Sequence, residues 1–182
     1  MLTESIITLM FILFFNIFEF TTPLDYYKYT SVAHIKNGID QNNYNELWRL
    51  ILHQFYHLST SHLLINCITF INIGVPLQDF FKMFSKYHYP LVVSLIVIFC
   101  GILNCVFHYL VYKFTSNEYY LNVNTCGFSG VLFGLQFFYH YLLKGDFVHA
   151  CKILAYQLFL MSILVPNVSN IGHFSGLVSG II

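Results

Sequence analysis

Apolar segments follow one another along almost the whole chain, and most are separated by only short polar stretches. Of the 182 residues, 57% are hydrophobic and 9% are charged. Because soluble domains carry about 25% charged residues, this chain lacks the side chains to cover a water-facing surface. Helices satisfy their own backbone hydrogen bonds in lipid. The sequence therefore predicts an all-α membrane protein that crosses the bilayer several times.

Six such segments can be distinguished, and together they predict a single six-helix domain over residues 1–182. A helix needs about 20 residues to span the hydrocarbon, and five segments come near that length. The sixth offers about 14 residues, or roughly 21 Å of helix, which suggests that it is truncated. No basic residue precedes the first segment, so we expect a retained helix rather than a signal peptide. The segments cover residues 5–20, 61–81, 90–112, 126–143, 147–165 and 169–182.

The long connection between the first two segments, residues 21–61, is too broken by Asn, Asp and Gly to span the membrane. Residues 46–56 within it repeat apolar side chains at helical spacing and include Trp48. Tryptophan favours the interface between lipid and water. We therefore expect an amphipathic helix in the headgroup region.

Composition excludes several classes of function. The net charge is zero and the chain has no basic tract, so nothing indicates binding to nucleic acid. The cysteines lie in or beside apolar segments and form no Cys-x-x-Cys pair, which argues against a disulfide framework or a zinc site. They are Cys67, Cys100, Cys105, Cys126 and Cys151. We expect neither a metal nor a cofactor, and the sequence sets no oligomeric state.

A serine flanked by small residues opens the fourth segment. Ser129 lies within the stretch Cys-Gly-Phe-Ser-Gly-Val-Leu-Phe-Gly that begins at Cys126. Gly130 and Gly134 have the Gly-x-x-x-Gly spacing that lets two helices approach closely in lipid. The motif alone fits either a helix-packing contact or a nucleophile.

Polar side chains on three different helices are predicted to meet at one depth in the membrane. Helices joined by short turns alternate in direction, so the second, fourth and sixth begin on the same side. Near these three starts lie His62 and Asn66, Ser129, and His173, respectively. Polar groups inside a membrane are costly and usually face the bundle interior or a wet cavity. For His62 and Asn66, hydrogen bonds that only hold helices together are the alternative explanation.

Glycines on the sixth segment offer a surface for close packing against the fourth. Gly172, Gly176 and Gly180 recur every four residues and so share one helix face. Gly130 and Gly134 provide the matching groove on the fourth helix. We therefore expect these two helices to lie nearly backbone to backbone.

This packing would bring Ser129 and His173 within hydrogen-bond distance. A serine hydroxyl becomes a nucleophile when an adjacent base takes its proton. None of the eight carboxylates falls near that depth in the three helices, so a Ser-His dyad is expected rather than a triad. His62, Asn66 and a backbone N–H would then stabilise the oxyanion that acyl transfer builds.

With these residues in place, the chain resembles the rhomboid family of intramembrane serine proteases over nearly its whole length. Both the order of the motifs and the topology fit. The residues around the serine are similar to the eukaryotic branch found in the endoplasmic reticulum and other secretory membranes. The resemblance rests on Trp48-Arg49, His57, His62-x-x-x-Asn66, Gly127-Phe128-Ser129-Gly130, His173, Gly176 and Gly180.

The resemblance implies a fold, a substrate class and roles for the matching residues. The fold would be a six-helix bundle with a membrane-embedded first loop, and the fifth helix would be its mobile side. Substrates would be single-pass membrane proteins, cleaved near the lumenal or extracellular face without metal or cofactor. Ser129 would be the nucleophile and His173 the general base, with His62 and Asn66 in the oxyanion hole. Structural support would come from Trp48, Arg49, His57, Gly127, Gly130 and Gly176.

Two features depart from the family pattern. Many members carry a glutamate where Gln78 stands, twelve residues after the oxyanion asparagine. Since glutamine still forms hydrogen bonds, we expect altered loop support rather than lost catalysis. The short sixth helix is the second departure, because it would anchor His173 less firmly.

Two alternatives to a protease stay open. One is a catalytically inactive rhomboid-like protein that binds membrane clients, although inactive relatives have lost the serine or the histidine, and both are present here. The other is a haem or metal protein, since several of the nine histidines fall within predicted helices. They include His108, His140 and His149. Their scatter over several depths favours core or interface histidines instead.

Charge gives conflicting indications of orientation. Four lysines lie opposite the candidate site, which favours a cytosolic location for that opposite side. Lys28 and Lys36, after the first segment, argue the other way. We give the lysines of the short loops and the resemblance more weight than Lys28 and Lys36. We therefore expect a multi-pass protein of the endoplasmic reticulum or another secretory membrane. The four lysines are Lys82, Lys86, Lys144 and Lys152.

Overall fold

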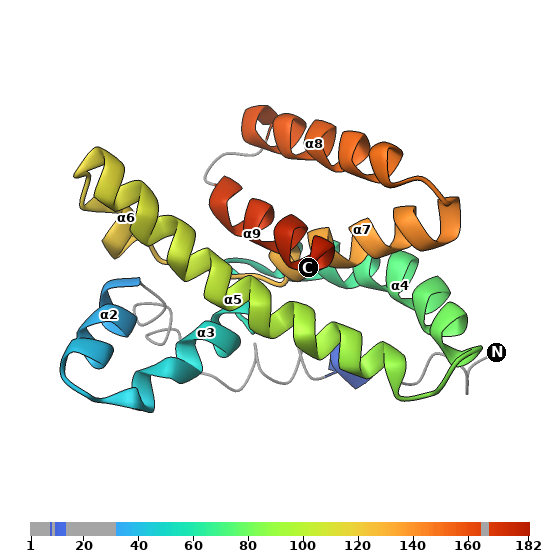
Figure 1. Ribbon diagram of the computed structural model, residues 1–182, viewed down its shortest axis with the longest axis horizontal. Coiled ribbons are helices and arrows are strands. Elements are labelled where there is room, and N and C mark those ends of the chain that lie inside the picture. Colours follow the sequence, from blue (N-terminus) through green and yellow to red (C-terminus); the bar gives the residue numbers. More distant parts are fainter. Residues whose placement is uncertain (1–7, 9, 14–31, 165–167) are drawn as a thin grey trace.

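The computed structural model describes residues 8, 10–13, 32–164 and 168–182, and helices dominate this part of the chain (Figure 1). The first predicted span, residues 5–20, and the turn at 166–167 lie largely outside the described residues. The other five predicted segments are all helical. They form α4 (Thr60–Lys82), α5 (His88–Thr115), α7 (Ser129–Lys144), α8 (Phe147–Leu164) and α9 (Asn170–Ile181).

Three of these helices, α4, α5 and α8, are long and apolar enough to cross a bilayer. This supports an integral membrane protein. Helix α7 has 16 residues and α9 has 12, whereas a full span needs about 20. The expected number of six spans therefore stays a prediction.

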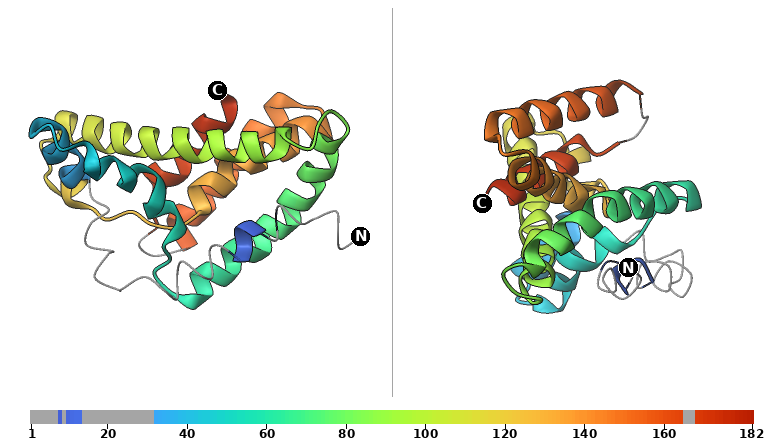
Figure 2. Two further views of the ribbon diagram at one scale, coloured as in Figure 1. Left: turned by 90° about the horizontal axis from the view of Figure 1, so that it is seen from below. Right: turned by 90° about the vertical axis from the view of Figure 1, so that its right-hand side faces the viewer.

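The connection before α4 folds into a series of short helices beside one half of α5 (Figures 1 and 2). The single amphipathic helix expected over residues 46–56 is instead a succession of 3-10 and α-helical turns. Helix α2 was not predicted, because the polar composition masks an apolar face on which Val32 and Ile35 are buried. The short elements are α2 (Val32–Asp40), η2 (Tyr44–Trp48), α3 (Arg49–Leu52) and η3 (His53–Phe55).

Arg49 is held inside this segment by two neighbours. Its side chain is almost fully buried and pairs with Glu46. The guanidinium carbon also lies 4.5 Å from the centre of the Trp48 ring. A buried charge is tolerated only when it is paired, so these contacts fix the start of α3.

The connection between α5 and α7 covers residues 116–128 and lies three residues later than the polar loop expected over residues 113–125. Helix α5 continues to Thr115, and a further short helix, α6 (Tyr119–Asn122), follows it. The main apolar core lies between α4, α5 and α7. Phe70, Ile96 and Leu135, one from each helix, are buried there.

Helix α9 packs closely against α7, as the spacing of the glycines predicted. A Cβ atom added to Gly176 would overlap the carbonyl of Gly130. A Cβ on Gly134 would lie 2.8 Å from the Gly176 carbonyl oxygen, and one on Gly180 would lie 2.5 Å from the Gly134 carbonyl oxygen. Larger residues therefore do not fit at this contact. Helix α9 also packs against α5, and α8 covers α7 and α9 from outside (Figures 1 and 2).

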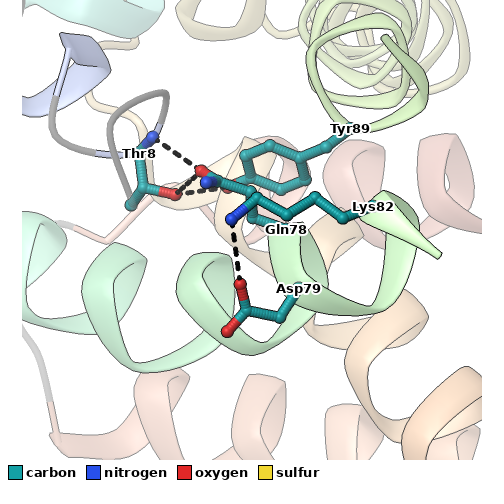
Figure 3. Close-up of polar contacts among 5 residues, drawn as sticks. All are labelled: Thr8, Gln78, Asp79, Lys82 and Tyr89. Carbon is teal, nitrogen blue, oxygen red and sulfur yellow. Dashed lines mark hydrogen bonds and ion pairs between the residues drawn. The ribbon is translucent and has the colours of Figure 1, made fainter. Parts of the chain in front are cut away.

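Thr8 is hydrogen-bonded to Gln78 of α4 and to Tyr89 of α5 (Figure 3). The backbone N–H and the hydroxyl of Thr8 each donate to Gln78 Oε1, both at 3.1 Å. The Thr8 hydroxyl also lies 3.1 Å from the hydroxyl of Tyr89. All three side chains are buried. The glutamine thus provides an acceptor that links a residue near the start of the chain to the core.

Candidate active site

Ser129 and His173 form a direct hydrogen bond. Ser129 is the first residue of α7, and His173 lies in the first turn of α9. The Ser129 hydroxyl is 2.9 Å from His173 Nε2. The contact predicted from the glycine spacing is therefore present.

The imidazole of His173 is positioned by packing. It stacks on the ring of Phe133, with 4.6 Å between ring centres and 21° between ring planes. Phe133 lies one turn beyond Ser129 on α7, so the same helix carries both the hydroxyl and the surface that supports its partner. His173 Nδ1 is buried and has no hydrogen-bond partner in the described part of the chain.

The start of α9 is fixed by a capping residue and a close backbone approach. The Ser169 hydroxyl accepts a hydrogen bond from the Gly172 N–H at 3.1 Å, which satisfies one of the free donors of the first helical turn. A Cβ atom on Gly130 would lie 3.0 Å from the Gly172 carbonyl oxygen. The cap and this contact together set the position of His173 relative to Ser129.

His62 packs against Gly127, two residues before the serine. Gly127 has a φ of +107°, a conformation that side-chain-bearing residues rarely adopt. A Cβ atom there would lie 2.6 Å from His62 Cε1 and 2.9 Å from His62 Nε2. Glycine is therefore required for both reasons.

Asn66 lies one turn beyond His62 on α4 and is buried. Its Nδ2 donor has no hydrogen-bond partner in the described part of the chain. Buried donors are nearly always paired in folded proteins. An unpaired amide next to a Ser-His contact is a donor available to a ligand.

His57 contacts both the residue before Ser129 and the ring of His62. The Phe128 N–H donates to His57 Nε2 at 3.5 Å, and the His57 ring meets that of His62 edge to face, 5.0 Å between centres. Burial lowers the pKa of His57 to about 3, so the ring is neutral and can accept this bond.

These groups open onto one cavity of about 680 Å³ between α4, α7, α8 and α9. Ser129, His173, His62 and Asn66 all line it. Side chains of α4 and α8 line the cavity together with α7 and α9, which carry the dyad. The structure therefore brings together the four residues that the sequence placed at one depth. In the described residues, no cluster of His, Cys, Asp and Glu side chains has the size to hold a metal ion.

A family model described as the rhomboid domain matches residues 44–182. The chain belongs to the rhomboid family. This confirms the family predicted from the motifs, and the matched range contains every candidate residue from Trp48 to Gly176.

Two curated relatives carry rhomboid names. "Rhomboid-like protein 14, mitochondrial" from Arabidopsis thaliana is 30% identical over 76% of this chain and 43% of its own length. "Rhomboid-related protein 4" from Homo sapiens is 23% identical over 84% of this chain and 49% of its own length. The chain thus spans less than half the length of these relatives.

The rhomboid site contains a polar cluster that the motifs did not indicate. His53 Nδ1 donates to the Arg49 carbonyl at 2.6 Å, which leaves His53 Nε2 as an acceptor 3.5 Å from Asn104 Nδ2. Asn104 also donates to the Thr125 hydroxyl at 2.8 Å. His108 Nδ1 in turn donates to the Asn104 carbonyl at 2.8 Å. The cluster joins the first connection to α5 and to the loop before Ser129.

Three further polar residues that line the cavity were not predicted from the sequence. They are Thr69, Gln136 and Gln157. Gln136 is isolated in an apolar stretch of α7, and neither Gln157 nor Thr69, three residues after Asn66, belongs to a recognised motif. The available signal was the polar character itself, since polar residues in membrane helices usually face a cavity or the bundle interior.

Proposed function

We propose that this rhomboid-family protein is an intramembrane serine endopeptidase with a Ser-His dyad. The observation that carries the proposal is the 2.9 Å hydrogen bond between the Ser129 hydroxyl and His173 Nε2 inside a cavity. Ser129 is the nucleophile, and His173 is the general base and then the general acid.

The dyad works without a carboxylate to orient the histidine. For Nε2 to accept the Ser129 proton, Nδ1 must carry the other ring hydrogen. Stacking on Phe133 restricts rotation of the ring in place of an acidic partner. Attack of Ser129 Oγ on a peptide carbonyl transfers its proton to His173. His173 then protonates the leaving amine, and water releases the acyl group from the serine.

The oxyanion formed during attack needs donors in place before the reaction. We assign this role to His62, the Nδ2 of Asn66 and the backbone N–H of Ser129. The unpaired amide of Asn66 supports the assignment, because it becomes satisfied when an oxyanion forms. Gly127, Gly130, Gly176, His57, Trp48 and Arg49 are assigned structural roles through the contacts described above.

The remaining parts of the proposal follow the family and the charge pattern. Residues 1–182 would form one six-helix domain with a membrane-embedded first loop. Substrates are single-pass membrane proteins whose spanning helix enters beside α8 and is cut near the lumenal or extracellular face. We propose a secretory-pathway membrane as the location, whereas the name of the Arabidopsis relative gives a mitochondrial location for that protein.

The test is cleavage of a tagged single-pass substrate by the purified chain in lipid vesicles. Ser129→Ala and His173→Ala should each abolish cleavage while the protein stays folded. Matched controls are Ser162→Ala and His149→Ala on α8, neither of which lines the cavity. Cleavage that survives Ser129→Ala rules out the mechanism. Binding of substrates without cleavage by any variant would instead identify an inactive rhomboid-like protein that holds membrane clients.

A further inference from the structure

A second group of polar side chains lies deeper in the cavity than the dyad. Thr69 on α4, Gln136 on α7 and Gln157 on α8 all line this cavity. Gln136 follows Ser129 by two helical turns, about 10 Å along the helix axis. Thr69 lies at the same spacing beyond His62, and Gln157 is two turns from the cavity end of α8. The three side chains therefore lie at about one depth, on three walls of the cavity.

Gln136 is not satisfied within the described part of the chain. Its Oε1 atom is buried and has no hydrogen-bond partner there. Every other residue of α7 from Gly130 to Phe138 is apolar or glycine, so the glutamine is isolated on its helix. Buried polar atoms without partners are rare, and polar groups in membrane helices usually serve a function.

The chemistry of the group defines what it can bind. The unpaired oxygen of Gln136 needs a donor, while amides and hydroxyls can both donate and accept. Thr69 and Gln157 offer the same kinds of groups from the facing walls. A side chain that brings its own donor and acceptor, such as that of Asn, Gln, Ser or Thr, would match this set.

We propose that Thr69, Gln136 and Gln157 form a polar subsite that hydrogen-bonds an amide or hydroxyl side chain in the membrane segment of the substrate. This inference rests on the proposed function. A distance of about 10 Å corresponds to about three residues of extended chain or seven of helix. The recognised side chain therefore lies three to seven residues from the scissile bond, on the side that is deeper in the membrane.

Hydrogen bonding by the subsite must be distinguished from a change in the stability of the substrate helix. Polar residues and glycine both loosen a membrane helix, and a looser helix is cut more easily. Only a polar residue can hydrogen-bond Gln136. A substrate with glycine at the same position therefore provides the control.

The experiment uses one single-pass substrate with an all-leucine segment, in which single positions three to seven residues beyond the cleavage site are changed to glutamine or glycine. Cleavage is measured with the full chain in phosphatidylcholine vesicles. We expect glutamine at one of these positions to raise the rate over leucine by about three- to tenfold, the range for one hydrogen bond. Gln136→Leu should remove this preference. Gln157→Leu should weaken the preference for glutamine. It replaces Gln136→Leu as the test variant if Gln136→Leu does not fold.

Ser162→Ala is the matched control. Its hydroxyl bonds the Phe159 carbonyl of its own helix at 2.7 Å, and it does not line the cavity. This variant should keep the preference for glutamine. If glycine equals glutamine, or the preference survives both Gln136→Leu and Gln157→Leu, the subsite is refuted and the protease function stands.

Binding separates failure of the subsite from failure of the protease. Photo-crosslinking of the same substrates to the Ser129→Ala protein measures recognition without cleavage. A glutamine preference that depends on Gln136 supports the subsite, even if no variant cleaves and the protease function is thereby overturned. Equal crosslinking of all substrates refutes the subsite. If cleavage is absent as well, the protease function also falls.

Discussion

At the scale of single residues, the candidate site is organised by small and apolar contacts more than by charge. His173 is oriented by the face of Phe133, and His62 is held against Gly127. Asn66 keeps a buried donor unpaired beside them. In a medium without water, such preorganised donors are strong because nothing competes for the developing charge.

Asn66 provides the most direct test of the oxyanion site. Asn66→Ala removes one donor and is expected to lower kcat by about 10²–10³ with little change in KM, the usual effect of losing one such donor. Kinetics with the tagged substrate measure both constants. Asn122→Ala, at the end of the exposed α6, is the control and should be neutral. A change confined to KM would assign Asn66 to substrate binding instead.

Gly127 tests the positioning of His62. Gly127→Ala forces a non-glycine residue into a positive φ, at about 1–2 kcal/mol, and places a Cβ atom against the His62 ring. We expect kcat to fall on the order of 10²-fold, the cost of a small misplacement of a reacting group. Gly145→Ala is the matched control, because Gly145 also has a positive φ, +75°, but open space around it.

The two glycine variants separate backbone strain from displacement of the histidine. Gly145→Ala should lose only the stability that the positive φ costs, while Gly127→Ala should lose at least that much and also lose activity. Equal activity in the two variants would contradict the role of Gly127 in positioning His62.

At the scale of helices, the sequence predicts long elements well and short ones poorly. The glycine repeats of the fourth and sixth segments allowed the α7–α9 contact to be predicted, because close backbone packing depends on few residues. Helix α2 was missed, since its burial depends on tertiary partners that its polar composition does not reveal. Gln136 was missed because a lone polar residue becomes informative only once the cavity around it is known.

The contact between α7 and α9 can be tested at Gly176. Gly176→Ala would overlap the Gly130 carbonyl and should cost about 1–3 kcal/mol, as overpacking does elsewhere. The shift of α9 would also separate His173 from Ser129. The rate at which a fluorophosphonate probe labels Ser129 should fall, and so should the thermal unfolding temperature in detergent.

Gly172→Ala is the milder comparison on the same helix. Its Cβ would approach the Ser169 hydroxyl at 3.0 Å rather than overlap backbone. Its loss of thermal stability should therefore be smaller than that of Gly176→Ala. The reverse order of stability would contradict the backbone-to-backbone packing.

Gln78 ties the start of the chain to the core and tests the departure from the family pattern. Gln78→Leu leaves both donors of Thr8 without their acceptor and should cost about 1–3 kcal/mol. Gln78→Glu keeps an acceptor at the same place (Figure 3), so as a buried neutral acid it should lose less stability than Gln78→Leu. Thermal unfolding measures both. Neither variant should change kcat, and a loss of kcat in Gln78→Glu would tie this residue to catalysis.

At the scale of the whole molecule, one end of the helix bundle carries the candidate site. The N-terminal ends of α4, α7 and α9 meet at the cavity, and α6 lies on the same side, just before α7. The turn between α7 and α8 lies on the opposite side. The family and the grouping of the candidate residues follow from the sequence. The number of full spans does not, because α7 and α9 are short and the first segment lies largely outside the described residues.

The orientation of that end of the bundle can be read from glycosylation in microsomes. Tyr119→Thr creates an Asn-Glu-Thr acceptor at the exposed Asn117, on the side of the site. Lys144→Asn combined with Asp146→Thr creates one in the opposite turn. If the site faces the lumen, only the first variant gains a glycan relative to the natural chain, seen as a glycosidase-sensitive increase in mass. A glycan on the second variant alone would place the site in the cytosol. A glycan on neither would contradict a secretory location.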